Sequence, residues 1–137
     1  MLLCGMLEEI VKKNVPFTGI YESSGFDKKG RISIPKPIVE ILKRRQNVHE
    51  KGEIELFYRL HTKEQLKYVE LTDYFPKRTK IDFKNYGHIS NMDKDNRILI
   101  PVVELELINI VNGNEVIFVG DGHKILVYKY SDYKVFK

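Results

Sequence analysis

An internal repeat with an offset of 66 residues constrains this chain more than any other feature of its sequence. Residues 26–35 (FDKKGRISIP) match residues 92–101 (MDKDNRILIP), so both copies read apolar-Asp-Lys-x-Gly/Asn-Arg-Ile-x-Ile-Pro. Where the first copy has Gly30 the second has Asn96, a residue that also tolerates the left-handed backbone of a tight turn. A repeated unit that cannot bury its apolar face alone is expected to pack against its neighbour. We therefore predict two turns, each leading into a short strand, around one shared core.

The segment after each motif predicts a helix. Pro37 stands where a helix can begin. The residues that follow it place three apolar side chains on one helical face: Ile38, Ile41 and Leu42. Residues 102–110 form the expected counterpart in the second copy, with Leu105 and Ile108 facing inward.

Two further helices are predicted outside these matched segments. Thr62 and Gln65 have the spacing of a capping box, which predicts a helix from Lys63 to about Asp73. Residues 1–16 have the apolar periodicity of a short amphipathic helix, on the face Leu3, Met6, Leu7, Ile10 and Val11. A helix this short is marginal alone in water, so we expect it to pack on the rest of the protein.

Alternation and short apolar runs predict the strands. Apolar side chains alternate at period two from Ile54 to Leu60. The runs 116–119 and 125–128 are continuous and apolar, which predicts strands buried on both faces, joined by a hairpin turn at residues 120–122. Residues 77–84 are basic and lack periodicity, so we interpret them as a linker to the strand before the second motif.

Composition argues against several classes of protein. The longest apolar runs are strand-sized, far below the roughly 20 residues that cross a bilayer. The first residues lack a cationic leader, so we expect a cytoplasmic protein with no membrane partner. The single cysteine, Cys4, cannot form an internal disulfide, and no paired spacing suggests a zinc site.

Neither a metal site nor a catalytic site is predicted. Asp93, Asp95 and Glu104 echo the spacing of a calcium loop. Ile98, however, stands where such a loop needs glycine. The four histidines lack ligand-like spacing, and we expect them exposed or in turns. With no nucleophile and base arrangement visible either, we predict no cofactor and no enzymatic activity.

The basic residues are clustered rather than spread evenly. The formal net charge is +4, and the clusters lie at residues 28–31, 43–45 and 77–84. Each cluster is compatible with a solvated face or with an anionic partner such as nucleic acid, and the sequence alone leaves both interpretations open.

From about Phe17 onward, the repeat and its flanks resemble the MraZ family. Gly19-x-Tyr21-Glu22 before the first motif is similar to that family's opening, and the runs from Val116 and from Ile125 are similar to its closing hairpin. The resemblance implies an α+β, β-rich fold of two tandem AbrB-like swapped-hairpin units that form a pseudo-two-fold single domain. The short N-terminal helix is an addition to the family's pattern. The predicted division of the chain is therefore an N-terminal helix at 1–16, a first unit at 17–76, a basic linker at 77–84 and a second unit at 85–137.

The same resemblance implies a sequence-specific transcriptional regulator, which we expect to be associated with the nucleoid. Such a protein binds repeated promoter elements in double-stranded DNA as a homo-oligomer, in this family a ring. By matching position, the resemblance implies that Arg31 is the principal DNA contact, with Lys28 and Lys29 beside it and with Arg97 and Lys94 as the counterparts in the second copy. An arginine fork suits a phosphate or the guanine edge.

The two copies differ in charge. The four charged residues of the first motif sum to +2, whereas those of the second sum to zero, so the first is expected to bind phosphate and the second to be mainly structural. Four residues are assigned to locking the turns: Asp27, Gly30, Asp93 and Asn96. Two alternatives stay open at this stage. Each arginine could simply lock its turn through the neighbouring aspartate, and the protein could be a ring-forming scaffold or an AbrB-like antitoxin without operator specificity.

Overall fold

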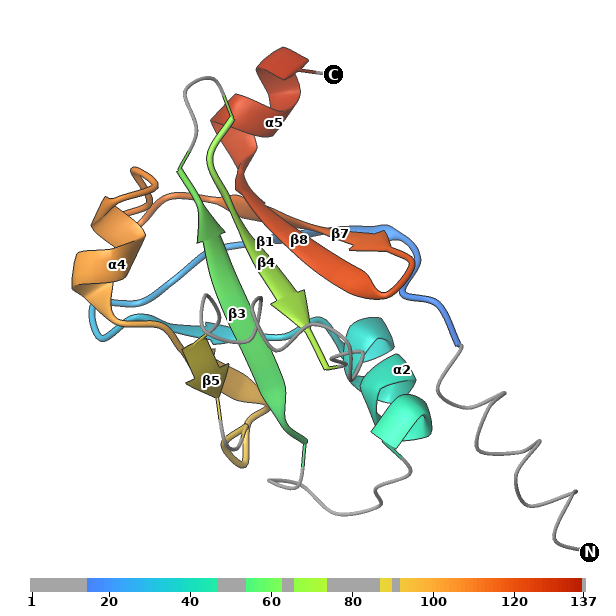
Figure 1. Ribbon diagram of the computed structural model, residues 1–137. Coiled ribbons are helices and arrows are strands. Elements are labelled where there is room, and N and C mark those ends of the chain that lie inside the picture. The colour runs from blue at the N-terminus through green and yellow to red at the C-terminus, as the bar shows by residue number, and fades with distance from the viewer. Residues whose placement is uncertain (1–14, 47–53, 63–65, 74–86, 90–91, 137) are drawn as a thin grey trace, which may run out of the picture.

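The computed structural model describes residues 15–46, 54–62, 66–73, 87–89 and 92–136, which form an α+β domain rich in strands (Figure 1). The elements run β1 (Ile20–Ser23), β2 (Arg31–Ser33), α2 (Lys36–Gln46), β3 (Leu56–His61), β4 (Tyr68–Thr72), β5 (Gly87–Ile89), β6 (Arg97–Leu99), α4 (Val102–Glu106), β7 (Val116–Asp121), β8 (Lys124–Lys129) and α5 (Tyr130–Phe136). The helix expected within residues 1–16 and the linker at 77–84 fall almost entirely outside the described residues.

Strands of the two halves of the chain are interleaved in the larger sheet. Among the described residues, an antiparallel sheet has the order β1-β7-β8-β4-β3, and the three-residue β5 adds a sixth strand at the edge beside β3. Three strands of the first half, β1, β3 and β4, correspond to β5, β7 and β8 of the second half. When each strand is exchanged for its counterpart, the same order is obtained from the opposite edge of the sheet. In particular, β1 pairs with β7 of the second half, and β5 pairs with β3 of the first half.

The two motif strands pair with each other as a separate two-stranded ribbon. In the β2–β6 ribbon, Ile32 lies opposite Ile98, Arg31 opposite Leu99, and Ser33 opposite Arg97. Because side chains opposite each other in an antiparallel pair share a face, the two isoleucines lie on one face and the other four residues on the reverse face. Ile32 and Ile98 are each 2% exposed, so the reverse face is the outward one.

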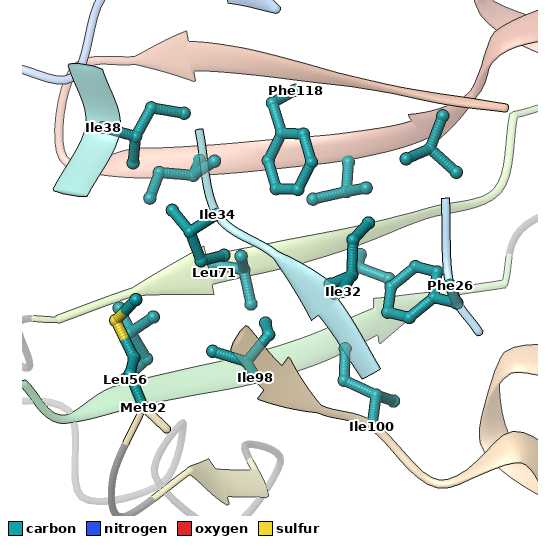
Figure 2. Close-up of a cluster of buried hydrophobic side chains, with 14 of the residues drawn as sticks. Phe26, Ile32, Ile34, Ile38, Leu56, Leu71, Met92, Ile98, Ile100 and Phe118 are labelled. Carbon is teal, nitrogen blue, oxygen red and sulfur yellow. The ribbon is translucent and has the colours of Figure 1, made fainter. Parts of the chain in front are cut away.

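The core lies between this ribbon and one face of the larger sheet. Figure 2 shows the ribbon side chains meeting residues of the sheet strands in a cluster that includes Ile32, Ile34, Ile98, Ile100, Leu56, Leu71 and Phe118. In both motifs, isoleucine alternates with polar or exposed residues. Because successive side chains of a strand point to opposite faces, the isoleucines point toward the sheet and the residues between them point away from it. The ribbon is thereby fixed on the sheet, and its outward face is held as a rigid surface.

The two predicted post-motif helices are present, but the second is shorter than expected. In α2, Ile38 and Leu42 are fully buried as predicted. Helix α4 ends at Glu106 instead of Ile110, although Leu105 and Ile108 are buried as expected. Asn109 adopts a φ of 60°, and the Ile110 amide donates to the carbonyl of Leu105 at 3.0 Å. This left-handed pattern closes the helix early.

The predicted helix from Lys63 to about Asp73 is wrong. Strand β4 occupies Tyr68–Thr72 and lies in the middle of the sheet, paired with β3 on one side and β8 on the other. Val69 and Leu71 are completely buried there. Tyr, Val and Thr favour strands, and pairing on both sides satisfies this segment's backbone, which outweighs a local capping signal.

The closing hairpin also differs in detail from the prediction. Gly120 and Asp121 extend β7, and the turn lies at Gly122 and His123. Strand β7 buries consecutive residues as expected, whereas β8 fully buries only alternate residues, Ile125 and Val127. The chain then continues into α5, a helix that the sequence pattern did not predict.

Arg45 joins several segments from inside the protein rather than belonging to a solvated basic cluster. Its guanidinium donates to both carboxylate oxygens of Asp73, and the two side chains are only 2% and 3% exposed. Nη1 also donates to the carbonyl of Val15 at 2.6 Å, and the ring of Phe17 lies 4.6 Å from the guanidinium carbon. The guanidinium of Arg45 thus joins the end of α2 to the end of β4 and to the chain before β1.

Replacement of Arg45 by alanine should destabilise the fold strongly, because it leaves the buried carboxylate of Asp73 without its counter-ion. Loss of one member of a buried pair costs about 3–5 kcal/mol. The adjacent Arg44 is exposed, so Arg44→Ala removes the same charge as a matched control and should change stability by about 0.5 kcal/mol or less. Urea denaturation followed by circular dichroism measures both; equal effects would contradict the role assigned to Arg45.

Within the described residues, no helix is both long enough and apolar enough to span a membrane.

Candidate nucleic-acid interface

The first Asp-x-x-x-Arg turn is closed by the aspartate that begins it. Oδ1 of Asp27 accepts hydrogen bonds from the backbone amides of Lys29 and Arg31, each at 2.9 Å. Oδ2 accepts a hydrogen bond from Nε of Arg31 at 2.7 Å. The bond from the Arg31 amide is the main cause that lowers the pKa of Asp27 below its ordinary value of 3.8. The carboxylate of Asp27 is therefore held ionised, and it fixes the Nε end of the Arg31 guanidinium.

The second turn repeats this geometry bond for bond. Asp93 accepts from the amides of Asp95 at 2.8 Å and Arg97 at 2.9 Å, and from Nε of Arg97 at 2.7 Å. Desolvation acts to raise the pKa of Asp93, but the hydrogen bonds from Arg97 and Asp95 outweigh it and lower the pKa. The two turns therefore have the same internal hydrogen bonds.

The two turns differ in the charge that surrounds the arginine. Nη2 of Arg97 lies 3.4 Å from a carboxylate oxygen of Asp95. Lys29 occupies the corresponding position of the first turn, and within the described residues the ion pair of Arg31 is with Asp27 alone. Lys28, Lys29 and Lys94 are all exposed. The first turn therefore presents a cationic surface, and the second presents a nearly neutral one.

Each turn sits beside the other repeat's strand. The amide of Ile100 donates to the carbonyl of Gly30 at 2.9 Å, and the amide of Ile34 donates to the carbonyl of Asn96 at 3.0 Å. The turns consequently lie at opposite ends of the β2–β6 ribbon, with its outward face between them. The structure brings together the sequence-predicted residues of both repeats along one ribbon, but it places Arg31 and Arg97 at opposite ends of it.

Sequence reasoning missed two members of this outward face. Ser33 and Leu99 are exposed and lie directly across the ribbon from Arg97 and Arg31, respectively. Period-two alternation around the isoleucines of each motif was the signal that could have identified them. The pairing of the two ribbon strands with each other decides which residue each of them faces.

Gly30 and Asn96 occupy equivalent positions but are not interchangeable. Asn96 has a φ of 59°, whereas Gly30 has a φ of 85°. A β-carbon added at Gly30 would collide with the carbonyl oxygen of Ile100. The first turn therefore approaches the neighbouring backbone more closely than a side chain allows.

Gly30→Asn should destabilise the protein although it copies the residue of the second repeat. Strain of this kind costs on the order of 1–3 kcal/mol. The reciprocal variant Asn96→Gly keeps a residue that adopts positive φ without strain, so it should change stability by about 1 kcal/mol or less. Thermal unfolding of the two variants tests this, and a Gly30→Asn protein as stable as the parent would contradict it.

The acidic residues that echo a calcium loop do not form a metal site. Within the part of the chain that the structure describes, no three potential metal-binding side chains among His, Cys, Asp and Glu come together. Glu104 instead accepts a hydrogen bond from the hydroxyl of Tyr58 at 2.8 Å, which joins β3 to α4.

Two of the four histidines have described side chains. His61 lies partly buried in strand β3, with Nε2 3.0 Å from a carboxylate oxygen of Glu70, so the expectation of an exposed or turn position was wrong for it. Because His61 lies in a paired strand, its side chain contacts a residue of the neighbouring strand, Glu70 of β4. His123 does lie exposed in the turn between β7 and β8.

Tyr58 should make the protein sensitive to alkaline pH. Burial, followed by the hydrogen bond and charge of Glu104, raises its pKa from 10.0 to about 12. The unfolded chain then loses this proton before the folded chain does, so the stability present below pH 10 is lost as the pH rises toward 12. Tyr58→Phe should show a smaller fall between pH 9 and pH 11.5 in urea titrations. An unchanged pH dependence would contradict this assignment.

No protein-family model matches the chain, and no curated protein matches it significantly.

Proposed function

We propose that this protein is a sequence-specific DNA-binding transcriptional regulator of the MraZ type. In this proposal, it acts in the cytoplasm at the nucleoid, as a homo-oligomer on repeated promoter elements, and it is not an enzyme. Two AbrB-like swapped-hairpin units, united as one pseudo-two-fold domain, would account for the interleaved sheet and the shared ribbon. The exchange of β1 and β5 between the halves supports this interpretation.

The observation that carries the proposal is the arrangement of cations around the first turn. Asp27 holds Nε of Arg31 at 2.7 Å, which leaves the two terminal nitrogens of the guanidinium for an outside acceptor. About a third of the Arg31 side chain is exposed, and Lys28 and Lys29 are exposed beside it. An arginine whose Nε is already held by a hydrogen bond loses less conformational freedom on binding than a free surface arginine does.

Such a surface suits DNA better than an isolated anion. Lysines beside the arginine favour contacts to several phosphates, which fix the register of the protein on the duplex. The arginine fork matches either a phosphate or the O6 and N7 acceptors of guanine. Few cations per protomer imply weak binding, so several copies on repeated elements would supply the affinity through avidity.

The main rival is that both arginines only lock their turns. Identical hydrogen bonds in the two turns favour that rival, since a lock would be needed in each repeat. The difference at Lys29 and Asp95 favours DNA binding by the first turn, because a lock does not require it. A scaffold or antitoxin-like partner without operator specificity remains the alternative function.

Arg31→Ala should abolish specific DNA binding, whereas Arg97→Ala should reduce it far less. If Arg31 reads a base, each site loses about 1–3 kcal/mol, and avidity multiplies the loss. The element is first selected from genomic DNA fragments with the purified protein. Fluorescence anisotropy at two salt concentrations then measures each variant.

Arg44→Ala, which removes an exposed charge in the last turn of α2, is the matched charge control and should bind like the parent. Lys28→Ala and Lys29→Ala should weaken binding to all DNA and lower the salt slope by about one unit each. If Arg31→Ala and Arg97→Ala bind DNA as the parent does but unfold more easily, the arginines only lock their turns. A parent protein that selects no element contradicts the regulator.

A further inference from the structure

One leucine interrupts the polar outward face of the β2–β6 ribbon. Leu99 is 50% exposed and lies directly opposite Arg31. At the equivalent place in the other repeat, Ser33 lies opposite Arg97. The ribbon therefore presents an arginine with a leucine at one end, and an arginine with a serine at the other.

The apolar surface continues toward the first turn. Val102 is 39% exposed, and a β-carbon at Gly30 would lie 3.6 Å from its Cγ2 atom, so this valine borders the turn that holds Arg31. Its counterpart by sequence is Lys36, which is exposed and charged. Leucine and valine thus flank the cationic turn and not the nearly neutral one.

DNA offers one apolar group at the same edge where an arginine reads guanine. That group is the C5-methyl of thymine in the major groove, which is wide enough for a two-stranded ribbon. Residues directly opposite in an antiparallel pair have Cα atoms about 5 Å apart, which corresponds to one or two base-pair steps of roughly 3.4 Å. A guanine bound by Arg31 would therefore place a neighbouring thymine methyl within reach of Leu99.

We propose that Leu99 is a specificity-determining residue that contacts a thymine methyl within two base pairs of the guanine bound by Arg31. This inference rests on the proposed function and adds the base class that the ribbon selects. Positive charge on the first turn favours DNA as the occupant of this face, because an apolar protein partner would have to cover Lys28, Lys29 and Arg31 as well.

The test removes only the methyl group. In the selected DNA element, each thymine near an essential guanine is replaced in turn by deoxyuridine, which keeps every hydrogen-bonding group. Burial of one methyl-sized group corresponds to about a fourfold change in affinity. The parent should bind one such uracil element about fourfold more weakly, whereas Leu99→Ser should bind the thymine and uracil elements equally. Val103→Ser, which changes a 71% exposed valine on α4, should discriminate as the parent does.

The remaining outcomes separate this inference from the proposed function. Equal binding of thymine and uracil elements by the parent overturns the role of Leu99 and leaves the regulator intact. An element with no thymine within two base pairs of an essential guanine does the same. If Leu99→Ser keeps the parent's discrimination and instead reduces the assembly size in light scattering, Leu99 is a protein contact. If the parent selects no element, the regulator itself fails.

Discussion

Burial of the ribbon isoleucines against the sheet is the interaction on which the rest of the structure depends. Ile32, Ile34, Ile98 and Ile100 are each 4% exposed or less and lie in the same cluster as Leu71 and Phe118. Neither motif strand has another strand partner within the described residues, so each relies on its counterpart for main-chain pairing. Pairing and burial together hold both Asp-x-x-x-Arg turns on one platform.

The platform matters because the turns themselves are small. A turn of four residues has little structure of its own, and here it is fixed by three hydrogen bonds to one carboxylate and by the neighbouring strand. The same hydrogen bonds position the arginine side chain. Structural locking and ligand recognition are therefore compatible roles for Arg31, since locking uses Nε and recognition would use the terminal nitrogens.

The two halves differ in the residues that join their helices to the sheet and in their exposed surfaces. The shorter α4 is joined to β3 by Tyr58 and Glu104, whereas the longer α2 ends in the buried Arg45 that pairs with Asp73. The two turns differ at Lys29 and Asp95, and the outward face of the ribbon differs at Leu99 and Ser33. The strand pairing is the same in both halves, but the surfaces differ, so the two ends of the ribbon are unlike.

The sequence by itself determined the repeat, the two turns, the short strands after them and the inward faces of both post-motif helices. These features depend on neighbours within a few residues, such as the spacing of Asp27 to Arg31 or the alternation of isoleucines, so local pattern is sufficient for them. Only the tertiary structure decided that residues 68–72 form a central strand, that Arg45 is buried, and that Leu99 faces Arg31. Each of these depends on which distant strand lies alongside, and long-range pairing overrides local propensity when it satisfies a buried backbone.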